Sequence, residues 1–281
     1  YMEGDIIIAL PLLMRDIAGT HYKDATSVYG YAGPVSKNLP LDYDNKTFKE
    51  TLKAYFLKNN YVTLFSRLNP FISSQDMILN DLGHLTNQGK VVNINIQEDI
   101  DLQRQHYQSR LKTHINKARR SCTLEEATTE QDIQEFMAIY YENMDRVNAK
   151  KFYYFNTMYF QKMVASNNFE SIILMAKENK TGQTIGASQF ITANGIVHYH
   201  LSGTKHEFLH LMPTKLLIDE MRLIAAQRGY QFFNLGGGLG GNIEDSLFKF
   251  KASFSKDFKD FNLWKWIVNK TVYNELVTKK G

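Results

Sequence analysis

The apolar residues of the chain recur with two different periods, which together predict a mixed α/β protein. Over 90–97 three apolar side chains alternate with polar ones, the pattern of a half-buried strand. Over 47–59 apolar residues recur every three or four positions, the spacing of a helix. Nearby, continuous apolar runs predict buried strands at 6–14 and 61–66.

A longer helix is expected over 100–122, because its apolar side chains form one stripe. Leu111, Ile115, Ala118 and Cys122 follow one another at i, i+4, i+7 and i+11. Cys122 completes this stripe, so we interpret it as a core residue.

In the second part of the chain, glycine, proline and asparagine mark the turns and helix ends more clearly. Asn194 and Gly195 both tolerate positive φ and predict a hairpin, while Pro213 and Gly229 mark the two ends of a helix. The expected elements are a helix at 130–143, strands at 171–177, 184–192 and 196–202, a helix at 213–229, a strand at 230–235, a helix at 245–254, a strand at 264–268 and an amphipathic segment at 270–279.

Composition narrows the class of protein. The 281 residues suit two small domains, and 43% hydrophobic against 22% charged residues predicts packed cores. A net charge of +4 does not indicate nucleic acid as the main partner, and a single cysteine excludes a disulfide scaffold.

The longest apolar run, 6–14, is far shorter than the ~20 residues of a membrane span, so we predict no transmembrane segment and a cytoplasmic protein. Because the chain opens directly into this run, we expect the natural protein to begin earlier.

Five blocks carry a family resemblance. They are Tyr29-Gly30-Tyr31-Ala32-Gly33-Pro34; Met144-Asp145-Arg146 followed by Phe152 and Tyr153; Tyr199-His200-Leu201-Ser202-Gly203-Thr204; Phe233-Asn234-Leu235-Gly236-Gly237-Gly238; and Ser246-Leu247-Phe248-Lys249-Phe250-Lys251-Ala252-Ser253-Phe254. In order and spacing they resemble the bacterial Fem family of peptidoglycan-bridge aminoacyltransferases, within the GNAT superfamily. The last block is similar to the family's aromatic-x-Phe-Lys-x-x-Phe signature.

The resemblance implies an α/β (α+β) fold of two tandem GNAT-like acyl-CoA N-acyltransferase domains with a cleft between them. We expect the first domain over 1–122, lacking its N-terminal start, and the second over 123–262, with 263–281 packing back on the first. The chain shows no long coiled-coil insertion of the kind that some members use for tRNA.

The same resemblance nominates Lys251 as the catalytic residue. Amide formation by acyl transfer places negative charge on the carbonyl oxygen, and a fixed donor aimed at that oxygen is often the largest catalytic contribution. By the same match Arg146 binds phosphate, a role for which its planar guanidinium is suited, and Tyr153 lines the cleft or packs in the core. The remaining candidates around the signature are Gly236, Gly237, Gly238, Ser246 and Phe250, where backbone N–H groups of a glycine-rich loop can approach a phosphate or carbonyl.

Two further sets of residues leave alternatives open. Arg110, Lys117 and Arg120 form either a solvated helix face or a contact for tRNA, a nucleotide-sugar or anionic lipid headgroups. His198 and His200 face one side of a strand, yet no third ligand accompanies them, so we predict no metal and name no general base.

The resemblance implies an N-acyltransferase acting on an amine of a peptidoglycan or surface-polysaccharide precursor, nucleotide- or lipid-linked. We expect no tightly bound cofactor, an aminoacyl-tRNA or acyl-CoA as donor, and at most a peripheral membrane contact. The turn at 204–212 has no glycine, which disfavours acetyl-CoA. The alternative is a non-catalytic GNAT-fold protein that binds a nucleotide-linked glycan or another polyanion.

Overall fold

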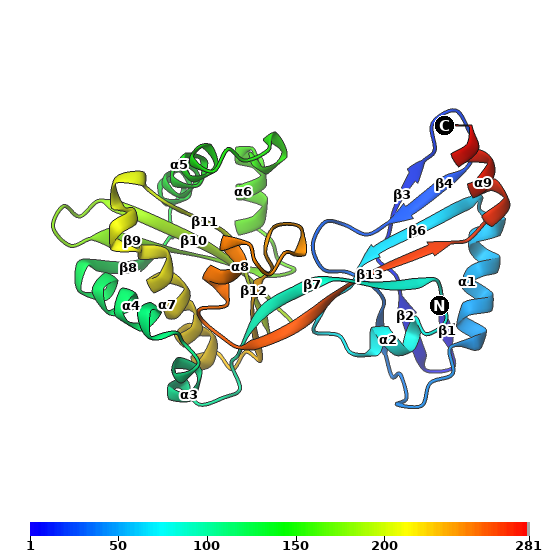
Figure 1. Ribbon diagram of the computed structural model, residues 1–281, viewed down its shortest axis with the longest axis horizontal. Helices are drawn as coiled ribbons and strands as arrows, with labels where there is room; N and C mark the ends of the chain where they lie inside the picture. Colours follow the sequence, from blue (N-terminus) through cyan, green and yellow to red (C-terminus); the bar gives the residue numbers. More distant parts are fainter. Residues whose placement is uncertain (280–281) are drawn as a thin grey trace. The chain divides into compact units, whose positions relative to one another are not determined.

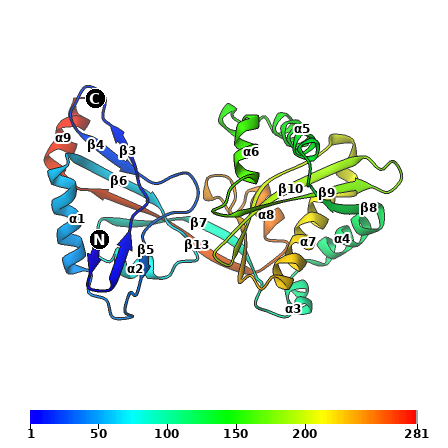
Figure 2. The same cartoon turned by 180° about the vertical axis from the view of Figure 1, so that it is seen from behind.

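The computed structural model describes residues 1–279 and divides into two compact units (Figures 1 and 2). The first unit holds residues 1–90 and the C-terminal segment from Lys259, and the second holds 91–258. Two long strands, β7 (His84–Asn95) and β13 (Asp257–Ile267), each contribute residues to both units.

The first unit contains two sheets. The smaller one is antiparallel and is formed by β1 (Met2–Glu3), β2 (Ile6–Ala9) and β5 (Val35–Lys37). In the larger one the order is β3 (Leu13–Asp16), β4 (Lys23–Thr26), β6 (Tyr61–Arg67) and β13, with β4 and β6 parallel. The helices of this unit are α1 (Lys46–Lys58), α2 (Ser74–Ile78) and α9 (Lys270–Thr278).

The core of the first unit is closed by α1, which buries Phe48 and Phe56. These rings pack in one cluster with Leu64 of β6 and Trp264 of β13. The expected single strand over 6–14 is wrong: the chain breaks between β2 and β3, and all residues of β3 are exposed. Pro11 lies at the break, where its missing N–H cannot join a ladder.

The second unit is a six-stranded sheet with helices on both faces. Its strand order is β7, β12 (Phe232–Gly236), β11 (Ile196–Thr204), β10 (Thr184–Ala193), β9 (Glu170–Glu178) and β8 (Cys122–Glu126). Neighbours are antiparallel except β11 and β12, which are parallel. The helical elements are α3 (Ile100–Gln105), α4 (Ser109–Ser121), α5 (Glu130–Arg146), η1 (Lys151–Tyr153), α6 (Thr157–Val164), η2 (His206–Leu211), α7 (Pro213–Gln227), η3 (Leu239–Gly241) and α8 (Ser246–Lys251).

Each face of this sheet has its own core. On one face, α4 and α7 pack Ile115 and Leu217 against Phe233 of β12. On the other face, α5 and α6 contribute Phe136 and Phe160, whose rings meet edge to face at 5.7 Å.

Several local predictions are confirmed. Asn194 and Gly195 have φ of +49° and +78° and join β10 to β11 as an antiparallel pair. Pro213 begins α7, and Gly229, at φ +69°, follows its end. Cys122 is buried in the core, as expected.

The region before Cys122 differs from the prediction in two ways. The single helix expected over 100–122 is two helices, separated at 106–108, and Cys122 itself begins β8. Residues 91–122, expected in the first domain, lie in the second unit, because the apolar stripe of α4 packs in the same core as α7. The C-terminal segment that belongs to the first unit begins at Lys259, four residues before the expected start at residue 263. Residues 280–281 of that segment lie outside the described residues.

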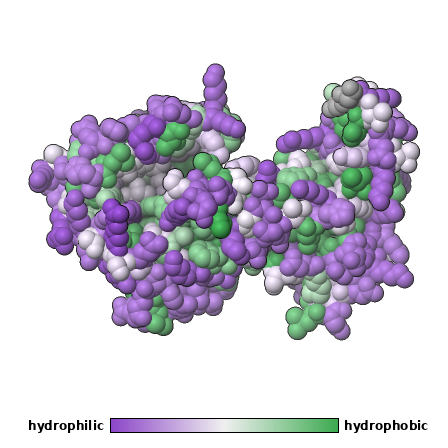
Figure 3. Space-filling view, viewed as in Figure 1, coloured by the Kyte–Doolittle hydropathy of each residue, from purple (hydrophilic) through white to green (hydrophobic). Residues whose placement is uncertain are grey.

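The surface facing the reader in Figure 3 is mostly hydrophilic over both units, with scattered apolar side chains. Every helix within residues 1–279 is too short or too polar to span a membrane.

Candidate active site

The candidate site lies where β11 and β12 part. The parallel ladder between them runs only from Ile196–Phe232 to His198–Asn234, although β11 continues to Thr204 along β10. The end of β12 and the loop after it are therefore not held by this ladder.

A glycine-rich loop follows β12. Gly236 has φ +80°, and its N–H donates to Asn234 Oδ1 at 2.8 Å, which fixes the start of the turn. A Cβ added to Gly238 would lie 2.5 Å from the backbone oxygen of Asn242, so the loop has no room for a side chain there. These two glycines are required by backbone geometry, whatever the loop binds.

Helix α8 begins directly after this loop and positions Lys251. Asp245 caps the helix: its Oδ2 accepts from the N–H groups of Leu247 and Phe248, and also from Leu239 N at 3.1 Å. One carboxylate thus holds both the loop and the first turn of the helix.

Lys251 is the last residue of α8 and only 8% exposed. Its Nζ donates to Gly237 O at 2.8 Å. Burial lowers the pKa of this ammonium to about 8, against a smaller opposing effect of Asp245. In the described part of the chain no carboxylate forms an ion pair with Lys251. A desolvated cation that uses one of its three donors on a backbone carbonyl can direct another at a substrate oxygen.

The other two candidates of the signature block differ in environment. Phe250 is partly buried and its ring meets that of Phe254 edge to face at 5.7 Å. Ser246 is the exposed first residue of α8. The structure therefore gives Phe250 a packing contact and leaves Ser246 at the surface.

Arg146 and Tyr153 belong to a different part of the second unit. Arg146, exposed at the end of α5, donates to Asn143 Oδ1, and Asn143 Nδ2 donates to Ser202 O of β11 at 3.4 Å. The backbone oxygen of Tyr153 accepts from Tyr140 OH at 2.8 Å. No hydrogen bond or ion pair described within residues 1–279 links Arg146 directly to Lys251.

The basic face of α4 includes a residue that the sequence did not predict, Lys215 of α7. Arg110, His114 and Lys117 share one side of the helix, and Lys215 of α7 joins them: its Nζ donates to His114 Nδ1 at 2.7 Å. Lys117 Nζ donates to His210 O at 3.3 Å. We call Arg110, His114, Lys117 and Lys215 the basic cluster.

Electrostatics support this grouping. Burial, together with the charges of Lys215, Arg110 and Lys117, lowers the pKa of His114. Burial and the nearby Arg110 also lower the pKa of Lys215. Arg120 lies about 80° from Arg110 around the helix, and it is not among the charges that lower the pKa of His114.

The two histidines of β11 have different hydrogen-bond partners. His198 Nδ1 lies 3.3 Å from Asn234 Nδ2, and burial lowers the pKa of His198 to about 4. His200 Nε2 lies 2.6 Å from Tyr159 OH of α6. Among the described residues no group of three His, Cys, Asp or Glu side chains is placed to hold a metal ion.

A buried row of polar side chains was missed from the sequence. Asn93 of β7 lies opposite Asn234 and donates from Nδ2 to Asp257 Oδ2 at 2.7 Å. Asn93 is fully buried, and its Oδ1 is without a hydrogen-bond partner in the described structure. Its alternation with apolar residues predicted a solvent-facing position, and only the pairing with Asn234 places it beside the glycine loop.

Comparison with known proteins identifies the fold. A family model described as an acetyltransferase (GNAT) domain matches residues 105–249. The crystal structure of FemX covers 97% of this chain and 87% of its own, with a TM-score of 0.73 at 11% identity. L-PGS from Bacillus licheniformis covers 98% of this chain and 89% of its own, with a TM-score of 0.61 at 15% identity. The C-terminal domain of a putative lysylphosphatidylglycerol synthetase from Agrobacterium fabrum covers 98% and 87%, with a TM-score of 0.59 at 12% identity. A search of curated proteins found no match. At these identities the likeness shows the fold, and it confirms the expected Fem-like α/β architecture.

Proposed function

Because the chain belongs to the family of GNAT acetyltransferase domains, we propose that it is an acyltransferase that joins an acyl or aminoacyl group to an amine. The acceptor in this proposal is a cell-wall peptidoglycan or surface-polysaccharide precursor. The observation that carries the proposal is the buried ammonium of Lys251, held against Gly237 O beside the glycine loop.

In the proposed reaction the acceptor amine attacks the carbonyl carbon of the donor. A C–N bond forms and the carbonyl oxygen becomes negatively charged. The intermediate collapses when the bond to the leaving group, the tRNA ribose oxygen or the CoA sulfur, breaks, and the proton of the amine passes to that leaving group directly or through water. Lys251 stabilises the oxyanion from a site where low exposure strengthens electrostatic interactions. Gly237 O fixes the direction of the Lys251 amine before substrate arrives, so little reorganisation is needed at the moment of reaction.

Aminoacyl-tRNA and acyl-CoA both remain candidate donors. The connection before α7 is the 3-10 helix η2 followed by Met212 at φ +57°, with no glycine between His206 and Met212. This favours a donor other than acetyl-CoA. The basic cluster offers a polyanionic donor several positive charges, and Arg146 suits a phosphate of the acceptor.

The acceptor class has two forms in this proposal. One similar structure is titled as a domain of a putative lysylphosphatidylglycerol synthetase, a name that refers to a lysine-bearing lipid and supports a lipid-linked acceptor beside a nucleotide-linked one. We place the reaction in the cytoplasm, where charged tRNA and acyl-CoA are available, with at most a peripheral membrane contact.

The test is transfer of label. The protein is incubated with charged tRNA or acyl-CoA carrying a labelled acyl group and with nucleotide- or lipid-linked muropeptide. We expect label in an amide of the acceptor with wild-type protein and a large loss with Lys251→Met. Binding of the acceptor without transfer from either donor would instead support the non-catalytic, polyanion-binding alternative.

A further inference from the structure

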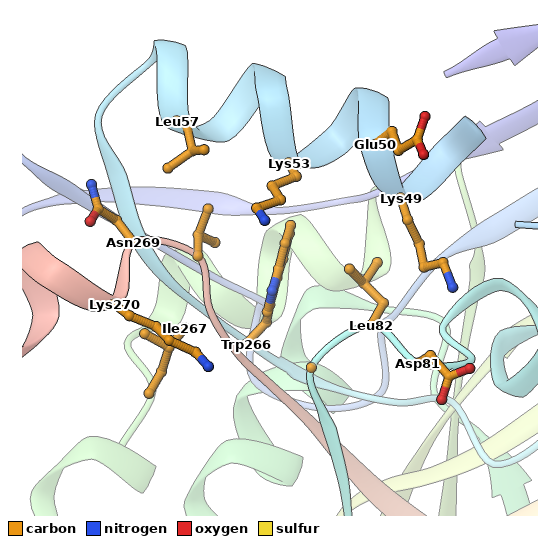
Figure 4. Close-up of a pocket in the computed structure, with 12 residues that line it drawn as sticks. Lys49, Glu50, Lys53, Leu57, Asp81, Leu82, Trp266, Ile267, Asn269 and Lys270 are labelled. Carbon is orange, nitrogen blue, oxygen red and sulfur yellow. The ribbon is translucent and has the colours of Figure 1, made fainter. Parts of the chain in front are cut away.

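The first unit contains a cavity of about 540 Å³ that none of the proposed acyl-transfer residues line. It lies between α1, the loop at 81–83 and the junction of β13 with α9 (Figure 4). Its lining includes the buried side chains of Leu82 and Val268 and the partly exposed ring of Trp266. This volume falls within the ~300–1,000 Å³ typical of small-molecule sites.

Three lysines surround this cavity. Lys49 and Lys53 lie one turn apart on α1, and Lys270 is the first residue of α9. Figure 4 shows Lys53 extending from α1 toward Trp266, Lys49 extending from α1 on the side of Asp81, and Lys270 on the opposite side of Trp266 from Leu82.

Acidic residues do not neutralise the lysines. Glu50 and Asp81 also line the cavity, yet none of the three lysines is in an ion pair anywhere in residues 1–279. In Figure 4 the Glu50 carboxylate is directed away from Trp266. The ammonium groups therefore remain available to an anion.

Trp266 supplies a rigid apolar surface. Its ring stacks on Trp264, with centroids 6.2 Å apart, and meets Phe56 at 5.7 Å. A ring supported in this way presents apolar area at little entropic cost.

We propose that this cavity binds an organic phosphate. Its phosphate oxygens contact Lys49, Lys53 and Lys270, and its apolar part lies along Trp266 and Leu82. A nucleotide and a phospholipid headgroup share this chemistry, a phosphate ester next to an apolar group. Lysine binds phosphate as a point charge, so a cluster of lysines accommodates either source. This site is separate from the proposed acyl-transfer site and does not depend on it.

Tryptophan fluorescence provides the test, because the chain has two tryptophans and Trp264 is fully buried. The probes are inorganic pyrophosphate, adenosine diphosphate and dihexanoyl phosphatidic acid, titrated into the full chain with calorimetry in parallel. We expect a saturable change from Trp266 with an organic phosphate. Each of Lys53→Ala and Lys270→Ala should weaken binding about tenfold, the loss of one charged hydrogen bond. Lys58→Ala is the matched control, since Lys58 is on α1 but does not line the cavity.

Comparing the three probes shows whether the site takes a nucleotide or a lipid headgroup. Tighter binding of the diphosphate nucleotide supports a nucleotide site, and tighter binding of phosphatidic acid supports a lipid-headgroup site. Equal affinity for pyrophosphate and both esters would overturn the role of Trp266. Absence of saturable binding in both fluorescence and calorimetry, or an equal effect of Lys58→Ala, would overturn the site altogether.

Discussion

Lys251 Nζ and Gly237 O lie 2.8 Å apart, joining the end of α8 to the loop after β12. The contact holds a nearly buried ammonium that pairs with no carboxylate in residues 1–279. Such an arrangement is more costly than a solvated lysine, and stability does not require it. Perturbed and desolvated cations of this kind concentrate at functional sites.

Lys251→Met should lower kcat by at least ~100-fold, about 3 kcal/mol of transition-state stabilisation, with acceptor KM nearly unchanged. Lys251→Arg should restore little, because a planar guanidinium presents its charge differently. The matched control is Lys249→Met, since Lys249 is exposed on the same helix and pairs with Glu244. Steady-state kinetics distinguish transition-state stabilisation from substrate binding. A rise in KM with unchanged kcat would show that Lys251 is a binding contact.

The pH profile distinguishes a donor from a base. Burial lowers the pKa of Lys251 to about 8, so the ammonium predominates below pH 8 and is lost above it. If the ammonium stabilises the oxyanion, kcat should fall as pH rises through about 8, and Lys251→Met should abolish that limb. A kcat that rises through pH 8 would indicate that the neutral amine acts as a base.

The basic cluster should contribute to polyanion binding as a unit. Replacing Arg110, Lys117 and Lys215 together by Ala should weaken binding of a tRNA acceptor-stem duplex and reduce the slope of log K against log salt by about 2 to 3. Arg120→Ala should change the slope less, because a single charge is removed and Arg120 is not among the charges that act on His114. An unchanged salt slope in the triple variant would return α4 to a solvated face.

Asp219 should be the main electrostatic determinant of stability in the second unit. It is fully buried and accepts hydrogen bonds from Arg104, Arg119, Arg222 and Tyr107, which connect α7 with α3, α4 and the segment between them. Asp219→Ala leaves Arg222, also buried, without its counter-ion, which should cost about 3–5 kcal/mol in the free energy of unfolding.

Glu220→Ala is the control for Asp219, because within residues 1–279 the one ion pair of Glu220 is with the exposed Arg119, at 3.5 Å. Its effect should stay below about 1 kcal/mol in urea unfolding. Similar costs for the two variants would mean that the buried network adds nothing beyond an ordinary surface pair.

Much of the secondary structure is determined locally, and the sequence was sufficient for it. Positive φ at Asn194–Gly195 and the start of α7 at Pro213 follow from the conformational limits of those residues alone. The stripe that contains Cys122 identified one face of a core, because burial requires apolar positions to recur with the period of the helix. The motif blocks likewise placed the glycine loop next to the helix of Lys251, since both belong to one short segment.

Domain assignment and the partners of the polar side chains depend on contacts between residues far apart in the sequence. Periodicity could not separate α3 from α4, because three residues of turn leave the apolar spacing almost intact. Nor could it assign 91–122 to a unit, since that depends on α7, a hundred residues later, packing on α4. Lys215 joined His114, and Asn93 joined Asn234, through contacts between distant segments. Local pattern specifies which face of an element is apolar; only the tertiary packing specifies which other element meets the polar face, and therefore which charges and amides share a site.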